Sequence, residues 1–327
     1  MTGGSSQQQT SESAPPRVSL GLPVYNGERH LAQAIDSILG QTFGDFELII
    51  TDNASTDATG EICRGYAERD SRVRYVRNET NVGAARNFNL TFELARGAYF
   101  KWVAHDDVCL PTFLERCVTT LDSAPPSVVL CMPRTTLIDQ DGAVVGDHDD
   151  DFDLRQPRAA ARLKHFGRII LSCGCHSVFG LIRTKVLRRT RLIGPFVASD
   201  TVLLGELAAE GELWELPERL FLARIHAECS HRKFKTAEEY AEWFAPAQSR
   251  GYVRFLRTKL ATECVRGIMR SSRPAREKPA CVAAFLYAWC RRQGQIDGGA
   301  LKRRLFAQLG RMRPTALGDG VAEPVQH

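Results

Sequence analysis

Apolar residues in the first third of the chain form short, uninterrupted runs, and each run ends in small, acidic or turn-forming residues. These runs lie at residues 18–22, 46–50 and 99–103. Between them, as in residues 29–39, apolar positions recur at the spacing of one helical face. Short apolar runs that alternate with helices of this length are typical of βαβ units and a parallel sheet.

The same reasoning assigns elements to most of the remaining chain. It predicts helices over residues 58–69, 84–95, 111–121, 162–170 and 200–211, strands over 73–76, 128–132, 135–138 and near 179–182, and a hairpin turn at 139–142. From residue 239 to 293 the pattern is helical, with an interruption at 271–274. The predicted fold class is α/β, with a mostly parallel, Rossmann-like sheet and a helical C-terminal extension.

We divide the 327 residues into four parts. Residues 1–16 are rich in Ser, Gln, Thr, Gly and Pro and have neither a basic start nor an apolar core, so we expect a disordered tail and not a signal peptide. Residues 17–235 would form the α/β domain, residues 236–310 a basic helical region and residues 311–327 a flexible tail. No stretch approaches the roughly 18 uninterrupted apolar residues of a membrane span. We therefore expect a cytoplasmic protein, and peripheral contact with the inner face of the membrane stays open.

Charge is distributed unevenly along the chain. Residues 1–150 hold 12 Lys and Arg against 21 Asp and Glu, whereas residues 151–327 hold 31 against 17. The basic second half could meet anionic lipid, a phosphorylated acceptor or a nucleic acid, or it could be a solvated face. Because it lacks interleaved aromatic residues and a recognisable motif, we expect no nucleic-acid partner. The ten cysteines are scattered, and without an export signal we expect them to be reduced and mostly buried.

Candidate chemistry gathers where the three apolar runs end. Residues 23–27 follow the first run, residues 52–57 the second and residues 104–107 the third. Open α/β sheets bind nucleotides at the carboxyl edge of their strands, where these three segments would meet. The carboxylate pair Asp106 and Asp107 is suited to hold a divalent cation beside a diphosphate. The sequence therefore predicts a nucleotide site at this edge.

In order and spacing, these segments resemble the family 2 glycosyltransferases. The residues that carry the resemblance are Pro23–Gly27, Asp52–Asp57, Asn81, Gly83, Arg86, Asn87, Gly97, Asp106 and Asp107. It covers roughly residues 17–230. The resemblance implies a GT-A fold and the transfer of a sugar from a nucleotide-diphosphate sugar to an acceptor hydroxyl, generally with inversion at the anomeric carbon.

The resemblance and the chemistry of the residues together suggest how a nucleotide would be held. Pro23 and Tyr25 could wall a slot for the base, Asp52 would accept the imide N–H of a uracil, and Arg86 would face the base and phosphates. The expected nucleotide-binding set is Pro23, Tyr25, Asp52, Asn81, Gly83, Arg86, His105 and Asp106. Asp52 with Arg86 suits uridine or thymidine better than guanosine. The alternatives are a helix cap and turn at residues 52–57 and a surface ion pair for Arg86.

The metal motif departs from the family pattern. Where the family usually has Asp-x-Asp, this chain has Ala104-His105-Asp106, so the contact of the first Asp is lost or supplied by His105. Asp106 falls on the position that reaches the metal, and we expect Mn²⁺ or Mg²⁺ to bind Asp106, Asp107 and His226. A structural histidine is the alternative role for His226.

Inverting transfer also needs a general base that takes the proton of the acceptor hydroxyl. Asp200, directly before the apolar helix, occupies the place of the family's acidic residue, and we predict that it is this base. A helix N-cap is its alternative role.

Two other functions compete with a transferase. A nucleotidyltransferase would carry a glycine-rich basic loop after the first strand, which residues 23–27 do not form. A nucleotide-sugar-binding module with a degenerate metal site would explain Ala104, but it would not need Asp106 and Asp200. The sugar stays open, and so does the acceptor, which could be a natural product or a cell-envelope or lipid-linked glycan.

Overall fold

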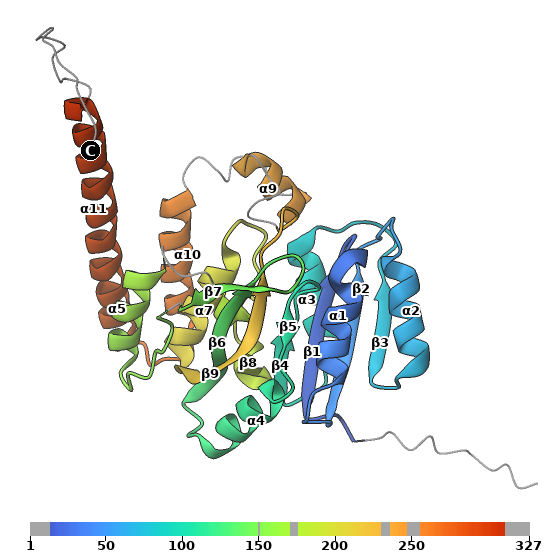
Figure 1. Ribbon diagram of the computed structural model, residues 1–327. Helices are drawn as coiled ribbons and strands as arrows, with labels where there is room; N and C mark the ends of the chain where they lie inside the picture. Colours follow the sequence, from blue (N-terminus) through green and yellow to red (C-terminus); the bar gives the residue numbers. More distant parts are fainter. Residues whose placement is uncertain (1–13, 150, 171–175, 230–235, 247–255, 311–327) are drawn as a thin grey trace, which may run out of the picture.

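The computed structural model describes residues 14–149, 151–170, 176–229, 236–246 and 256–310. Within these ranges, nine strands form one sheet in the order β3-β2-β1-β4-β8-β6-β9-β5, with β7 paired to β6 (Figure 1). The strands are β1 (Val18–Val24), β2 (Phe46–Asp52), β3 (Val73–Arg77), β4 (Tyr99–Trp102), β5 (Val108–Cys109), β6 (Val128–Ile138), β7 (Val144–His148), β8 (Leu181–Arg183) and β9 (Glu212–Arg224). The helices are α1 (Glu28–Leu39), α2 (Thr59–Arg69), α3 (Ala84–Glu93), α4 (Phe113–Ser123), α5 (Ala159–Ile169), α6 (Thr184–Leu187), α7 (Ser199–Glu210), α9 (Ala237–Phe244), α10 (Leu256–Arg270) and α11 (Lys278–Gly310), with a short 3₁₀ helix η1 (His176–Phe179).

The first four strands of the sheet order are parallel, as the alternation of strands and helices predicts. β1 pairs with β2 and β4, and β2 pairs with β3. Every residue of β1 and β2 is buried. Strands covered on both faces need continuous apolar sequence, which explains why these two runs do not alternate.

The other half of the sheet is mixed. β6 and β9 are parallel, whereas β8 runs antiparallel to both β4 and β6. β5 pairs antiparallel with β9, and β7 pairs antiparallel with β6. Residues 128–132 and 135–138 belong to one strand, so the prediction of two strands was wrong. The pairing of β6 with β9 shifts its register around Pro133 and Arg134, which lets the strand continue past the proline. The predicted strand near 179–182 is confirmed only in part, because His176–Phe179 is a 3₁₀ helix.

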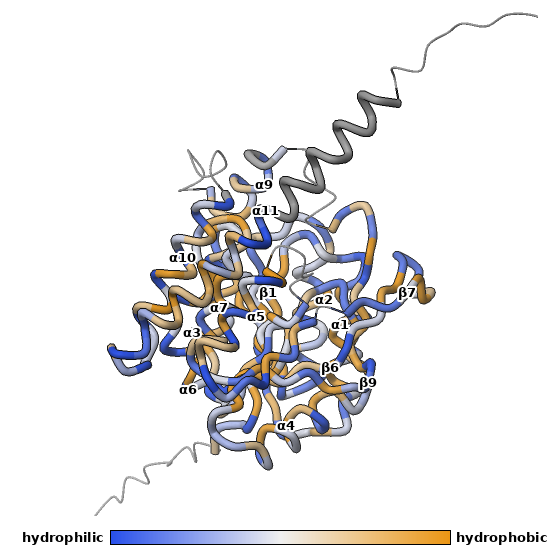
Figure 2. The backbone as a smooth tube through the Cα atoms, turned by 90° about the vertical axis from the view of Figure 1, so that its left-hand side faces the viewer, coloured by the Kyte–Doolittle hydropathy of each residue, from blue (hydrophilic) through white to orange (hydrophobic). Residues whose placement is uncertain are grey.

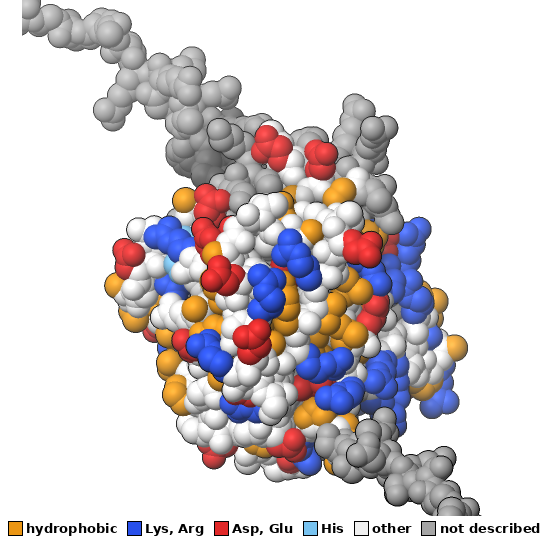
Figure 3. Space-filling view, turned by 90° about the vertical axis from the view of Figure 1, so that its right-hand side faces the viewer, with side chains coloured by type: hydrophobic (Ala, Val, Ile, Leu, Met, Phe, Trp, Pro, Cys, Tyr) orange, Lys and Arg blue, Asp and Glu red, His pale blue; other side chains and the backbone are white. Residues whose placement is uncertain are grey.

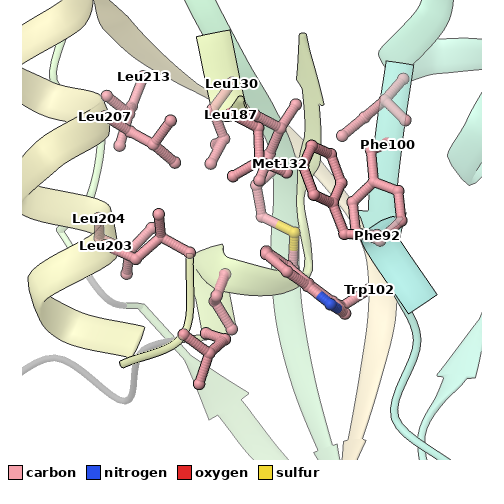
Figure 4. Packing of buried hydrophobic residues seen from close by; sticks show 14 of the residues in the cluster. Phe92, Phe100, Trp102, Leu130, Met132, Leu187, Leu203, Leu204, Leu207 and Leu213 are labelled. Atoms are coloured by element: carbon pink, nitrogen blue, oxygen red, sulfur yellow. The ribbon is translucent and has the colours of Figure 1, made fainter. Parts of the chain in front are cut away.

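Helix α7 packs its leucines into the core of the sheet. In Figure 4, Leu203, Leu204 and Leu207 point toward a cluster that includes Trp102 and Met132, and all five side chains are buried. The hydrophobic segments in Figure 2 likewise run through the interior, although the exposed hairpin that ends in β7 carries apolar residues outward. Nearly every residue of α7 is buried, including Ser199 and Thr201 in its first turn.

Helices α10 and α11 pack onto the α/β domain at the end opposite α2 and β3 (Figure 1). α11 lies against α5, and α10 lies against α7. Arg191 joins the buried carboxylates of Glu206 on α7 and Glu263 on α10, and Arg270 also reaches Glu206 at 3.0 Å. Part of the positive charge of residues 151–327 is therefore neutralised by ion pairs with buried carboxylates.

The described cysteines agree with the expectation of reduced, mostly buried thiols. Among the described residues, eight cysteines are outside any disulfide, and all but Cys290 are buried. Cys173 and Cys175 lie outside the described ranges.

The surface combines both signs of charge. On the side of α2 and β3, Figure 3 shows Lys and Arg side chains beside Asp and Glu side chains. No helix in the described parts of the chain is long and apolar enough to cross a membrane.

Candidate active site

The carboxyl ends of β1 and β2 lie side by side and are tied together by hydrogen bonds. In the parallel pairing of the two strands, Val24 is opposite Asp52. The Asn26 N–H donates to Ser55 Oγ at 2.9 Å, and the Thr56 N–H donates to Asn26 Oδ1 at 2.8 Å. These bonds hold two of the three predicted segments at one edge of the sheet.

The third segment joins them through His105. A Cβ atom added to Gly27 would lie 2.6 Å from His105 Cδ2, so the imidazole packs against the turn after β1. Pro23 is buried in β1, whereas Tyr25 is 38% exposed beside this turn. The Tyr25 ring is accessible to a ligand, and the roles of Pro23, Tyr25 and His105 in binding a nucleotide stay predictions.

Asp52 is fully engaged inside the protein. Its side chain is 0% exposed and accepts hydrogen bonds from the Ser55 N–H at 2.8 Å, from the Tyr75 hydroxyl at 2.8 Å and from the Arg77 guanidinium. This geometry favours the turn-forming role of Asp52. Because Asp52 is 0% exposed, a uracil imide could reach it only if its surroundings opened, and this contact stays a prediction.

The loop before α3 is fixed by amide side chains. Asn81 Oδ1 accepts from Asn53 Nδ2 at 2.8 Å and from the Gly83 N–H at 2.9 Å, and Asn53 Oδ1 accepts from the Val82 N–H. Gly83 has a φ of 85°, which favours glycine. A Cβ atom there would come within 2.5 Å of Pro246 Cδ, just after α9. Asn81 and Gly83 therefore shape this loop, and their contact with a nucleotide stays a prediction.

Arg86 takes the alternative role in this structure. Its guanidinium pairs with both oxygens of Glu93, which lies two turns further along α3. Both side chains are about half exposed, so the pair contributes little to stability. A swing of Arg86 toward the N-terminus of α3 would free it for a donor phosphate, which also stays a prediction.

Asp106 and His226 form the centre of the candidate site, although they are 120 residues apart in sequence. Asp106 Oδ2 lies 2.9 Å from His226 Nε2, and Cys229 Sγ completes a group whose ligand atoms all lie within 4.8 Å of one another. Burial would raise the pKa of Asp106, but the charge of His105 and the hydrogen bond from His226 lower it to about 2. Asp106 is therefore an anion at neutral pH, as a metal ligand must be.

Asp107 faces different partners. Its Oδ1 accepts the Arg224 N–H at 2.8 Å, and burial together with the charge of Asp106 raises its pKa well above the ordinary value. Asp107 lies outside the group formed by Asp106, His226 and Cys229, and its role as a metal ligand stays a prediction.

Arg224 is the last residue of β9 and holds the loop that carries Asp106. Its guanidinium donates to the carbonyl oxygens of Asp106, Asp139 and Gln140 and to Gln33 Oε1. The side chain is buried and anchors these loops together.

Asp200 lies in the first turn of α7. Its Oδ1 accepts the Thr201 N–H at 2.7 Å, and burial raises the pKa of its carboxyl above the ordinary value despite this bond. The N-cap position itself is Ala198, with a φ of 62°. A carboxylate with a raised pKa is a stronger base, which agrees with the predicted role of Asp200 without testing it.

Several side chains of this edge were not singled out by the sequence. Tyr75 lies in the strand expected over residues 73–76, and Arg77 follows two positions later on the same face. Their place beside Asp52 is defined only by the folded sheet. Cys229 follows His226 in a His-x-x-Cys spacing. His30 lies on the buried face of α1, and burial together with the charges of Arg224 and His226 lowers its pKa to about 4.

The donor set fits a divalent cation. A carboxylate from the loop after β4 and an imidazole and a thiol from the turn after β9 converge here, and each is an established ligand type.

Comparison with known proteins decides the family. The model of "Glycosyl transferase family 2" matches residues 19–190. The chain belongs to glycosyltransferase family 2. The first part of this family 2 member, up to β8 and α6, thus carries the family signature.

Similar sequences cover only part of the chain. Glycosyltransferase GlyG of Streptococcus pneumoniae is 33% identical over 113 residues, which are 35% of this chain and 38% of GlyG. An uncharacterized glycosyltransferase of Haemophilus influenzae is 24% identical over 216 residues, which are 64% of this chain and 66% of that protein. The match therefore spans well under half of GlyG and about two thirds of the H. influenzae protein.

Solved structures show the same GT-A fold. S. aureus TarS 1–349 in complex with UDP-GlcNAc aligns with a TM-score of 0.60 at 16% identity, over 83% of this chain and 72% of that one. The mannosyltransferase PcManGT from Pyrobaculum calidifontis, in complex with GDP-Man and Mn²⁺, aligns with a TM-score of 0.50 at 17% identity, over 92% and 81% of the two chains. The family 2 chain thus shares its architecture with transferases that bind nucleotide sugars.

Proposed function

We propose that the protein is an inverting glycosyltransferase that moves a sugar from a UDP- or dTDP-linked donor to an acceptor hydroxyl, with help from Mn²⁺ or Mg²⁺. The observation that carries the proposal is the pair of Asp106 and His226 at the sheet edge where the ends of β1 and β2 meet. Family membership and the nucleotide-sugar complexes of the structural neighbours support it.

Two carboxylates of the chain would have separate tasks. Asp106, ionised at neutral pH, would hold the cation together with His226. The bound cation would neutralise the charge that develops on the diphosphate leaving group. Asp200 would take the proton from the acceptor hydroxyl as that oxygen attacks the anomeric carbon from the face opposite the diphosphate.

The thermal unfolding midpoint tests the donor site. We would measure it with UDP, dTDP, GDP and ADP, each with and without Mn²⁺. A ligand at a hundred times its dissociation constant stabilises a protein by about 2.7 kcal/mol, which gives a clear shift. We expect a metal-dependent rise with UDP or dTDP, and no shift with any nucleotide would contradict the proposal.

Release of UDP or dTDP from their sugar conjugates, measured across candidate acceptors, then tests transfer. Nucleotide binding without release from any conjugate would favour the binding-module alternative.

A further inference from the structure

His30 is a buried histidine, and one of its two ring nitrogens, Nε2, makes no hydrogen bond with the described residues. The residue is 8% exposed, and among the described residues its Nε2 atom is buried and has no hydrogen-bond partner. Buried polar atoms without partners are rare in folded proteins and call for an explanation, such as a missing ion. A ligand or ion that contacts His30 Nε2 would therefore satisfy this buried atom.

The ring of His30 lies against the candidate metal site. Its centroid is 5.1 Å from that of His226, with the two rings tilted by 56°. His226 in turn lies 2.9 Å from Asp106. The imidazole thus comes from α1, a part of the chain distant in sequence from both other residues. It lies beside the group of Asp106, His226 and Cys229 but outside its 4.8 Å span, so the ring would shift toward a shared cation.

Cys229 is held in this group by the turn that follows β9. Its Sγ atom accepts the His226 N–H at 3.2 Å and lies 3.3 Å from the Arg224 carbonyl oxygen. These contacts fix the sulfur near His226 Nε2 and Asp106 Oδ2, within the 4.8 Å span of the group. The sulfur is therefore positioned by backbone atoms of His226 and Arg224.

We propose that His30 and Cys229 are further ligands of the cation held by Asp106 and His226, so that the site binds Zn²⁺ or Co²⁺ more tightly than Mg²⁺. The inference rests on the metal site of the proposed function. Imidazole and thiolate donors suit zinc and cobalt, whereas magnesium prefers oxygen donors alone. On metal binding the Cys229 thiol would lose its proton to solvent, and the sulfur would bind as thiolate.

The preference itself is not a sufficient test. Nearly every nitrogen, oxygen and sulfur site binds zinc and cobalt more tightly than manganese. The diagnostic result is that substitution of His30 or Cys229 reduces the affinity for Co²⁺ much more than the affinity for Mg²⁺.

The experiment is a Co²⁺ titration of the full-length protein, followed by visible and near-ultraviolet absorption. We expect a thiolate-to-cobalt charge-transfer band in the wild type and in His30→Phe, but not in Cys229→Ser. His30→Phe should lower the Co²⁺ affinity by at least about 10- to 100-fold, since groups that only support a ligand already contribute that much. An unchanged band in Cys229→Ser or an unchanged affinity in His30→Phe would overturn the assignment of that residue.

Matched controls separate this inference from the proposed function. His165→Phe and Cys290→Ser change the same residue types outside the group and should leave Co²⁺ binding unaltered. Asp106→Asn should abolish binding.

The outcomes distinguish the two proposals. If Asp106→Asn abolishes binding while His30→Phe and Cys229→Ser do not, the metal site is supported and the assignment of His30 and Cys229 as ligands is wrong. If the wild type binds no cation at all, the metal part of the proposed function falls too, and UDP binding measured without metal shows whether the donor site survives.

A measurement on the wild type alone covers the case in which a variant does not fold. X-ray absorption of the Zn²⁺-loaded protein counts ligands without any substitution. One sulfur and two imidazoles are expected, and a spectrum without sulfur or with one imidazole would contradict the proposal.

Discussion

Asp106 and Asp107 are neighbours in sequence, yet their carboxylates serve different partners. Asp106 bonds to the His226 imidazole, whereas Asp107 accepts a backbone N–H from Arg224. Asp106 belongs to the candidate metal group, whereas Asp107 contacts the end of β9, and its expected metal role stays a prediction. This division makes the two positions a matched pair for mutagenesis.

We predict that Asp106→Asn abolishes the gain in UDP affinity that Mn²⁺ provides, because it removes the anionic ligand. Asp107→Asn should retain this gain, since an amide oxygen can still accept the Arg224 N–H. Isothermal titration of UDP with and without Mn²⁺ measures both effects. If both variants lost the Mn²⁺-dependent gain in UDP affinity equally, Asp107 would also be a metal ligand.

Asp200→Asn should lower kcat by about a hundredfold or more, the contribution expected of a general base, while UDP affinity is unchanged. Ser199→Ala is the control: the Ser199 hydroxyl is buried without a hydrogen-bond partner among the described residues, so its loss should have little effect. If kcat is unchanged in Asp200→Asn, the residue only stabilises the start of α7.

The pH profile gives a second test of Asp200. The base acts only when deprotonated, and burial raises its pKa. We therefore expect kcat to fall on the acidic side at a higher pH than for an ordinary carboxylate. This acidic limb should be absent from the residual activity of Asp200→Asn.

Glu47 should make stability depend on pH. Burial would raise its pKa, but hydrogen bonds from Arg96, Ser19 and Arg74 lower it below the ordinary 4.5. The unfolded state therefore takes up the proton first, so the contribution of Glu47 is complete above pH 4.5 and is lost as the pH falls through the lower, folded-state pKa. Urea unfolding between neutral and acidic pH should show this loss, and Glu47→Gln should show a weaker dependence and about 2 kcal/mol less stability at neutral pH. Exposed Glu61→Gln serves as the control and should change neither.

Arg191→Ala should lower the free energy of unfolding by about 3 kcal/mol, because it leaves two buried carboxylates with fewer partners. Arg189→Ala, two residues away, loses only a partly exposed pair with Glu210 at 3.6 Å and should cost less than about 1 kcal/mol. Chemical denaturation measures both variants. Equal costs would show that Arg191 is not a special link between α7 and α10.

Local patterns predicted the parallel half of the sheet because burial on both faces leaves an unmistakable apolar run. They failed where the sheet becomes mixed, since Pro133 breaks the run without ending β6. The role of Asp52 was open for a related reason. Its partners Tyr75 and Arg77 come from a strand whose register only the folded sheet defines.

The candidate metal site was predictable only in part. Asp106 and His226 are found from the sequence by family resemblance, which names positions but not their distances. His30 and Cys229 could not be found in this way, because their residue types occur elsewhere in the chain as ordinary core side chains. Only the approach of α1 to the turn after β9 distinguishes them.

The contact between Gly83 and Pro246 has a consequence for protein engineering. The loop before α3 and the segment after α9 lie in close contact at these two residues, although more than 160 residues separate them. A chimera that exchanges the C-terminal helices with those of a relative would therefore need to carry residues 78–83 along with them. A cut at the end of the family match, residue 190, would place Gly83 and Pro246 on separate fragments.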